Sequence, residues 1–148
     1  GPWCRPPPNA APVHSKATGL YMICTLSKHW AEAQKIDDAM MLDWRGFVSE
    51  GTGANIFLNI DGKLHTPTPD CFLNGITRQT VMKIAKEHQI EVVERHIPVE
   101  DLAKATECFV TGTAAEVTPV GSIDDNTFTV GSMTQTLMKS YSDLVRGN

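Results

Sequence analysis

Short β-type runs, separated by turn residues and interrupted by helical stretches, constrain the fold of this chain more than any other feature. The early runs are 39–43, 47–50, 55–60 and 63–66, and the later ones are 91–96, 108–111 and 116–120. Arg45-Gly46 and Asp61-Gly62 each lie between neighbouring runs and predict two hairpins. Asp61-Gly62 is the stronger signal, because its residues tolerate the positive φ of a tight turn.

Apolar residues at helical spacing predict helices that interrupt these runs. The expected helical ranges are 16–34, 77–89, a short helix over 99–105 behind Pro98, and a last helix capped by Ser132. The apolar face of the first range consists of Leu20, Ile23, Cys24, Ser27, Trp30 and Ala31, and that of the last consists of Met133, Leu137, Met138, Tyr141, Leu144 and Val145. This order of elements predicts an α+β fold with a mixed or mainly antiparallel sheet.

Composition narrows the class of protein. A chain of 148 residues fits one ordinary domain. The chain has 17 acidic and 13 basic residues, so it lacks the excess of positive charge that is typical of nucleic-acid-binding proteins. No stretch of the sequence approaches the roughly 18 consecutive apolar residues of a membrane-spanning helix. The four cysteines form no CxxC pair and the histidines no HxxxH pair, so we expect no metal site. These features predict a soluble intracellular protein, in the cytoplasm.

Two short segments could bind an anion. Gly75-Ile76-Thr77 places a glycine and a hydroxyl residue at a helix start, where backbone N–H groups and the helix dipole favour a phosphate. Thr113 and Ala114 lie in a small-residue turn that lets a ligand approach the backbone amides. Taken singly, each segment has a structural alternative, since Thr77 can simply cap the helix and the second turn can simply pack tightly. By the same standard, Lys16 and Glu50 are ordinary surface charges.

Four stretches taken together, and in this order, carry a resemblance. They are Lys-Ala-Thr-Gly-Leu-Tyr at 16–21, Ser-Glu-Gly-Thr-Gly-Ala-Asn-Ile-Phe at 49–57, Leu-Asn-Gly-Ile-Thr-Arg at 73–78 and Thr-Gly-Thr-Ala-Ala-Glu-Val-Thr-Pro-Val at 111–120. With them the sequence resembles the class IV (fold type IV) aminotransferases that use pyridoxal 5′-phosphate, and it looks most like the branched-chain amino acid aminotransferases. The family's fold implies a mainly antiparallel sheet or pseudo-barrel flanked by helices.

The resemblance implies a role for each matching residue. Lys16 would form the Schiff base with the cofactor aldehyde and then move a proton, Tyr21 would bind the ring oxygen, and Glu50 would keep the pyridine nitrogen protonated. The phosphate would be held by a further set: Gly75, Ile76, Thr77 and Thr113. The amides of Thr113 and Ala114 would hold the substrate carboxylate.

The resemblance also implies an organisation and a reaction. Residues 1–14, which contain five prolines, would be the remnant of an interdomain linker, and residues 15–148 the cofactor-binding domain, without the smaller N-terminal domain of the family. The reaction would move an amino group between branched-chain amino acids and 2-oxoglutarate, in a homodimer. Three alternatives stay open: a D-amino acid aminotransferase, an enzyme like aminodeoxychorismate lyase, and a non-catalytic binding or dimerisation module.

Overall fold

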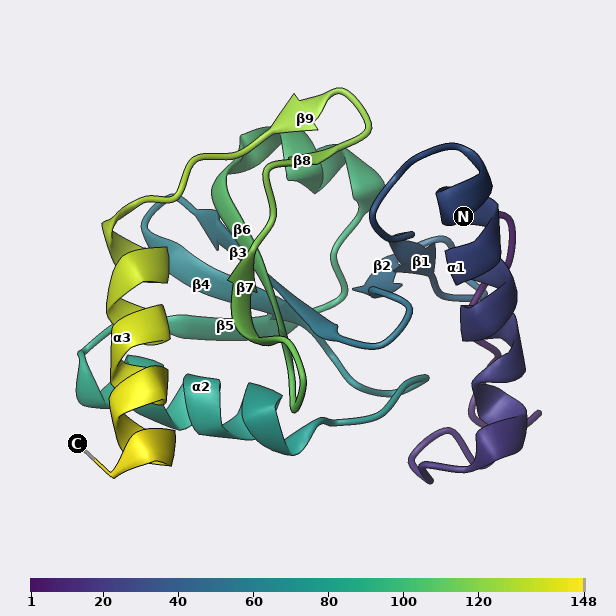
Figure 1. Ribbon diagram of the computed structural model, residues 1–148, viewed down its shortest axis with the longest axis horizontal. Coiled ribbons are helices and arrows are strands. Elements are labelled where there is room, and N and C mark those ends of the chain that lie inside the picture. The colour runs from purple at the N-terminus through teal and green to yellow at the C-terminus, as the bar shows by residue number, and fades with distance from the viewer. Residues whose placement is uncertain (148) are drawn as a thin grey trace.

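The structure, a computed structural model, describes residues 1–147 and combines a twisted sheet with three α-helices (Figure 1). The helices are α1 (Met22–Ala33), α2 (Ile76–Glu87) and α3 (Ser132–Arg146), with 3₁₀ turns η1 (Thr18–Leu20) and η2 (Val99–Lys104). The strands are β1 (Met41–Leu42), β2 (Val48–Glu50), β3 (Asn55–Ile60), β4 (Lys63–Pro67), β5 (Val92–Arg95), β6 (Ala105–Gly112), β7 (Glu116–Pro119), β8 (Ser122–Ile123) and β9 (Asn126–Thr127). The α+β prediction is confirmed.

Strands β1–β7 form one sheet in which β3 is central. The pairs β1–β2, β2–β3, β3–β4, β3–β6 and β6–β7 are antiparallel, and β4–β5 is parallel. Both expected hairpins are present, since β1 pairs with β2 and β3 with β4. Asp61 and Gly62 have φ values of 53° and 75°, as a tight hairpin turn requires.

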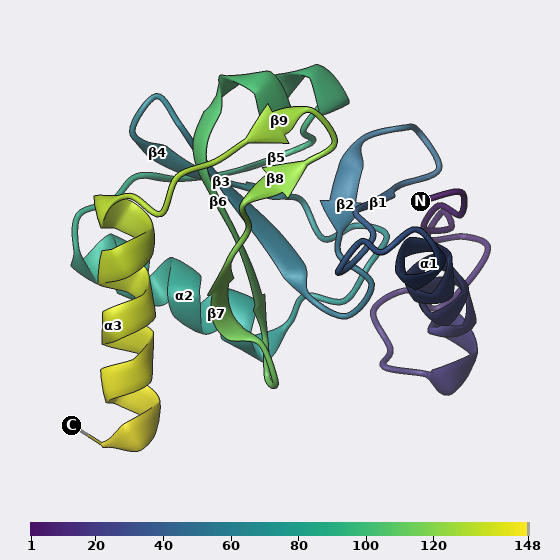
Figure 2. The ribbon, with the colours of Figure 1, turned by 45° about the horizontal axis from the view of Figure 1, so that its top comes forward.

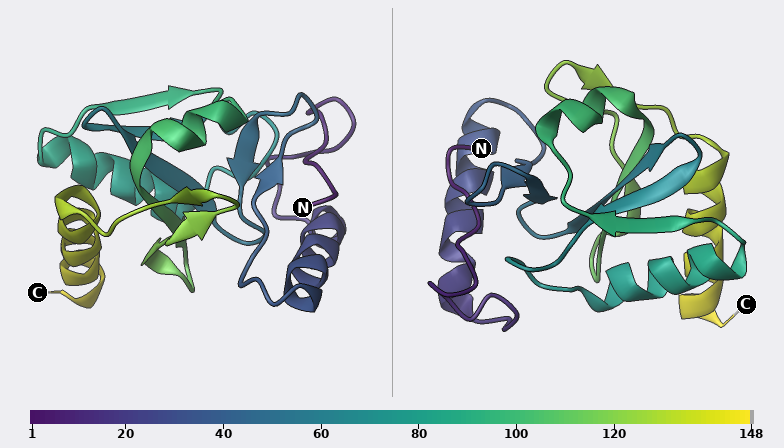
Figure 3. Two further views of the ribbon diagram at one scale, coloured as in Figure 1. Left: turned by 90° about the horizontal axis from the view of Figure 1, so that it is seen from above. Right: turned by 180° about the vertical axis from the view of Figure 1, so that it is seen from behind.

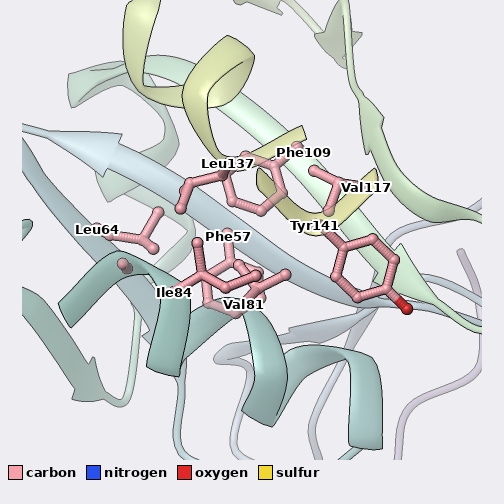
Figure 4. Packing of buried hydrophobic residues seen from close by; sticks show 9 residues of the cluster. Phe57, Leu64, Val81, Ile84, Phe109, Val117, Leu137 and Tyr141 are labelled. Carbon is pink, nitrogen blue, oxygen red and sulfur yellow. The ribbon is translucent and has the colours of Figure 1, made fainter. Parts of the chain in front are cut away.

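Successive side chains of β3 and β6 point to opposite faces of the sheet, and an apolar layer covers each face. On one face Phe57 stacks on Phe109 with ring centroids 5.0 Å apart, and α2 and α3 cover both rings. Figure 4 shows Val81 and Ile84 of α2 and Leu137 and Tyr141 of α3 closing over this layer. The residues buried on the other face include Ile56, Leu58, Ile97, Leu102 and Cys108. Burial on both faces makes the β3–β6 pair a rigid centre for the fold.

Helix α1 lies at the end of the molecule opposite α3, beside β1 and β2 (Figures 1 and 2). The expected helix over 16–34 is shorter than predicted, because 16–17 are not helical and a 3₁₀ turn precedes α1. Cys24, Ser27 and Ala31 are buried as the periodicity predicts, but Trp30 is 39% exposed. Residues 1–14 contribute Arg5 and Val13 to the buried interior.

Helix α3 begins at Ser132, as predicted, but the expected cap is wrong. The N-cap residue is Gly131, which has no side chain that could bond the helix start. Instead the Glu107 carboxylate accepts a hydrogen bond of 2.8 Å from the Thr134 backbone N–H. A carboxylate at a helix N-terminus satisfies free N–H groups and faces the positive end of the dipole. Gly131 leaves room for it, since a Cβ there would lie 2.5 Å from the Glu107 carboxyl carbon. At the far end of α3, Leu144 and Val145 are exposed.

Every helix among residues 1–147 is too short or too polar to cross a membrane.

Candidate functional site

A cavity of about 520 Å³ lies where the N-terminal segment, the β2–β3 loop, the start of α2 and the β6–β7 turn meet. Its lining includes Lys16, Tyr21, Glu50, Thr77 and Thr113, which sequence analysis placed in one site from four separate stretches. The volume is in the range of small-molecule and cofactor sites. Seen from above and from behind, α1 and α3 lie far apart at the two ends of the molecule (Figure 3).

Lys16 reaches the cavity from an exposed segment without regular secondary structure just before η1. The preceding turn is closed by the Ser15 N–H, which donates to the Pro12 carbonyl at 2.9 Å. Tyr21 follows η1 and lines the same cavity. Burial, and then the nearby Glu50 carboxylate, raise the pKa of the Tyr21 phenol. Tyr21 therefore keeps its proton and can donate a hydrogen bond to an oxygen of a ligand.

Glu50 ends strand β2, is buried and lines the cavity. Burial raises the pKa of Glu50 from 4.5 to about 7, and the Arg5 guanidinium opposes this increase. Its Oε2 accepts a hydrogen bond of 3.1 Å from Asn55 Nδ2, and its Oε1 lies 3.2 Å from Arg5 Nε. A carboxyl group with this pKa can carry a proton or a negative charge at neutral pH.

Arg5 is the counter-ion of Glu50, and its side chain is only 3% exposed. Its NH1 donates to the Leu20 carbonyl at 3.3 Å and to Cys24 Sγ at 3.2 Å. The backbone of Arg5 is held as well, since its N–H donates to the Leu42 carbonyl at 2.8 Å. These contacts connect the N-terminal segment to α1 and β1 and place a fixed positive charge beside Glu50.

The start of α2 supplies the anion-binding end of the cavity. Gly75 is extended at the N-cap position, and within residues 1–147 no side chain of this position caps α2. The N–H groups of Ile76 and Thr77 belong to the first turn, which has no intrahelical acceptors, and both residues line the cavity. The alternative in which Thr77 caps the helix is therefore wrong, and the free amides fit a phosphate.

Arg78 holds the start of α2 in place through hydrogen bonds of its side chain. Its guanidinium is buried and donates to Asn74 Oδ1 at 2.8 Å, to the Pro67 carbonyl at 3.0 Å and to Glu94 Oε2 at 2.6 Å. These bonds connect the first turn of α2 to the loop before it and to β4 and β5. The amides of that turn are thus held in place before a ligand arrives.

The β6–β7 turn borders the cavity on its remaining side. Thr111, Gly112 and Thr113 line the cavity, whereas Ala114 is exposed and outside its lining. Gly112 is close to the β2–β3 loop, since a Cβ on it would lie 3.4 Å from the Gly53 carbonyl oxygen. The structure therefore brings together every predicted cofactor residue, but not Ala114.

One group of possible metal ligands occurs among residues 1–147: Asp43, Asp70 and Cys71. Arg45 NH2 already donates to Asp43 Oδ2 at 2.6 Å and to Asp70 Oδ1 at 2.9 Å. The Arg45 guanidinium bridges the two carboxylates, so Asp43 and Asp70 already belong to an ion-pair cluster.

Sequence reasoning missed three residues at this site. Arg5 carried no signal, because its partner Glu50 is 45 positions away in a chain with many surface charges. His14 lines the cavity two residues before Lys16, and no motif marked it. Asn55 stood inside the second matching stretch, between the glycine turn and the strand, and its buried side chain could have been suspected from that position.

Comparisons with known proteins agree with this geometry. The amino-transferase class IV family model matches residues 2–123. A probable branched-chain-amino-acid aminotransferase of Rickettsia felis is 43% identical over 150 residues, which cover 99% of this chain and 52% of the relative. The chain thus spans about half the length of the curated relatives it matches.

Solved structures give the same result. The branched-chain aminotransferase of Thermoproteus uzoniensis with norvaline superposes with a TM-score of 0.96 at 40% identity, covering 99% of this chain and 50% of that one. The branched-chain amino acid aminotransferase of Thermobaculum terrenum, in its PLP form, has a TM-score of 0.94 at 35% identity, covering 99% of this chain and 49% of that one. With the family model matching most of its length, the chain belongs to the class IV aminotransferases.

Proposed function

We propose that this chain is the cofactor-binding part of a branched-chain amino acid aminotransferase and that its cavity takes pyridoxal 5′-phosphate. One observation carries the proposal: a lysine, a buried carboxyl group with a pKa of about 7 and the free amide end of a helix share one cavity. The names of the similar proteins support branched-chain amino acids as the substrate class. The curated relatives and the solved structures are named as branched-chain aminotransferases, the one from Rickettsia felis as a probable one.

The residues present fit the cofactor at both of its polar ends. The phosphate would bind the amides of Ile76 and Thr77 and the hydroxyl of Thr113, next to a glycine that keeps the helix start open. Glu50 would face the ring nitrogen and Tyr21 the ring oxygen. When bound, the cofactor supplies an aldehyde and an electron-withdrawing ring.

Lys16 would supply the amine that bonds to the cofactor aldehyde. Lys16 is exposed and lies outside the helices and strands, so its side chain can enter the cavity and can leave the bond when a substrate amine takes its place. The released amine would then carry a proton to and from the substrate Cα.

Glu50 would hold a proton on the ring nitrogen. Because its pKa is about 7, Glu50 can give its proton to that nitrogen at neutral pH, and the product is a carboxylate paired with a cation. Arg5, 3.2 Å away, stabilises the carboxylate that remains. Asn55 donates to the other carboxylate oxygen, so the charged form is supported on both sides.

Amino transfer from leucine to 2-oxoglutarate tests this proposal. The assay compares this chain with a longer one that supplies the half of the relatives that it does not span. We expect the longer chain to be active and Lys16→Ala to abolish its activity. Preferred turnover of D-amino acids, or release of pyruvate from a chorismate-derived amine, would favour the enzymes of related specificity instead. Cofactor binding without turnover in either chain would indicate a binding module. The homodimer stays a prediction of the resemblance.

A further inference from the structure

Asn55 has a buried side chain with every polar group engaged. Its Nδ2 donates to Glu50 Oε2 at 3.1 Å and to the Leu73 carbonyl at 3.0 Å, and its Oδ1 accepts from the Gly75 N–H at 3.2 Å. These partners fix the orientation of the amide, because a flipped amide would place its oxygen against two acceptors and its nitrogen against a donor.

The contact with Gly75 is close enough to dictate the residue there. A Cβ on Gly75 would lie 2.5 Å from Asn55 Oδ1, so another side chain would displace the amide. The backbone conformation of Gly75 itself, with φ −60° and ψ 145°, is open to any residue. The glycine is therefore explained by the approach of Asn55, not by the turn.

The register of the sheet places Asn55 between two parts of the cavity. Asn55 pairs with Glu50 of β2 on one side and with Thr111 of β6 on the other. Directly paired residues of antiparallel strands lie on the same face, so these three side chains form a polar row that lines the cavity. From this row the Asn55 amide reaches the residue before α2. It is thus a hydrogen-bonded connection between Glu50 and the helix start.

We propose that Asn55 is a positioning residue that sets the separation between the Glu50 carboxylate and the N-terminal amides of α2. A ligand with a ring nitrogen at one end and a phosphate at the other then meets both partners already in place. This proposal rests on the proposed function, since that ligand is pyridoxal 5′-phosphate. Preorganisation of this kind increases affinity for the whole ligand more than for its separate parts.

The same strand offers a matched control. Asn59 lies four residues after Asn55, and its Nδ2 donates to Glu107 Oε1 at 2.8 Å. Glu107 holds the start of α3, away from the cavity lining. Asn59→Ala therefore removes the same kind of amide–carboxylate bond from the same strand without touching the ligand site.

The test uses ligands that lack the aldehyde, so that reaction with lysine does not contribute. Pyridoxine 5′-phosphate, pyridoxine and inorganic phosphate are titrated into this chain, into Asn55→Ala and into Asn59→Ala, with the amide resonances of Gly75 and Thr77 as reporters. For Asn55→Ala we expect affinity for pyridoxine 5′-phosphate to fall about tenfold or more, as the loss of hydrogen bonds to a charged group implies. Affinity for the two fragments should change by less than about threefold, and Asn59→Ala should bind all three ligands like the unaltered chain.

Asn55→Asp provides a second variant of nearly the same shape if Asn55→Ala does not fold. It keeps an oxygen for the Gly75 N–H but opposes Glu50 with an acceptor, which raises the pKa of Glu50, as carbon-13 spectra of the labelled carboxyl can show. Arg5, Tyr21 and Cys24 interact electrostatically with Glu50, and His14 and Lys16 line the same cavity. All five are unchanged in this variant.

The outcomes separate this proposal from the one on which it depends. Equal losses for all three ligands, or none, would show that Asn55 is only structural and would overturn the proposal while the proposed function stands. An unaltered chain that binds pyridoxine 5′-phosphate no better than inorganic phosphate would overturn both.

Discussion

Replacing Glu50 by glutamine should change how the stability of the protein depends on pH. Burial raises the pKa of Glu50 from 4.5 to about 7. In the folded protein the group therefore keeps its proton at pH values where the unfolded chain has lost it. The stability that comes from this group is complete below pH 4.5 and is lost as the pH rises to about 7. At about 1.4 kcal/mol per pKa unit the loss amounts to about 3 kcal/mol.

Glutamine cannot ionise, so the variant does not lose this stability. We expect the difference in unfolding free energy, variant minus wild type, to increase by about 3 kcal/mol between about pH 4 and about pH 8 and to be constant above that. Urea denaturation followed by far-ultraviolet circular dichroism across this pH range measures it. The contributions of the other titratable groups to the pH dependence cancel in the difference between variant and wild type. A difference that does not change with pH would refute a raised pKa at Glu50, and with it the role of Glu50 in carrying a proton.

Three further substitutions test neighbouring contacts. Arg5→Met should destabilise the protein by about 3–5 kcal/mol at about pH 8, where Glu50 is charged, and by less at about pH 5, as urea unfolding at both values can measure. Glu107→Gln should destabilise the protein by about 1.5–3 kcal/mol at about pH 7, because the Thr134 N–H loses a charged acceptor. Burial alone would raise the pKa of Glu107, but its hydrogen bonds together lower it, so the destabilisation should disappear as the pH falls through that pKa. Destabilisation that persists in acid would contradict this. Thr113→Val should weaken inorganic phosphate binding, measured by calorimetry, by about tenfold because its hydroxyl is removed, while the melting temperature of this exposed position changes little. Unchanged binding would remove the Thr113 hydroxyl from the site.

Local signals predicted the elements better than their contacts. Asp61-Gly62 needs only its own backbone to form a hairpin, so the sequence was enough. Ser132 marked the start of α3, but the group that satisfies the helix start is Glu107, 25 residues earlier in the chain and on another element. Trp30 fitted the apolar periodicity of α1 yet is 39% exposed, because periodicity does not say how wide the buried stripe is.

At the candidate site, too, local features could be predicted from the sequence and long-range contacts could not. Gly75 before α2 and Thr77 in its first turn predicted an anion site, since a helix start is a local feature. Roles for Lys16 and Glu50 came from the resemblance alone, because a single lysine or glutamate carries no chemistry until its neighbours are known. Arg5 and Asn55 were missed for the same reason: each acts through a hydrogen bond or ion pair that exists only once strands and segments have come together.

Whether the cavity holds pyridoxal 5′-phosphate on Lys16 can be decided by identifying the lysine that bonds to the cofactor. The protein is mixed with pyridoxal 5′-phosphate, reduced with borohydride, digested and mapped by mass spectrometry. We expect one dominant labelled residue, Lys16, with labelling lost in Lys16→Ala and suppressed by inorganic phosphate. A label found mainly on Lys28 of α1 or Lys83 of α2, which are outside the cavity lining, would contradict this assignment.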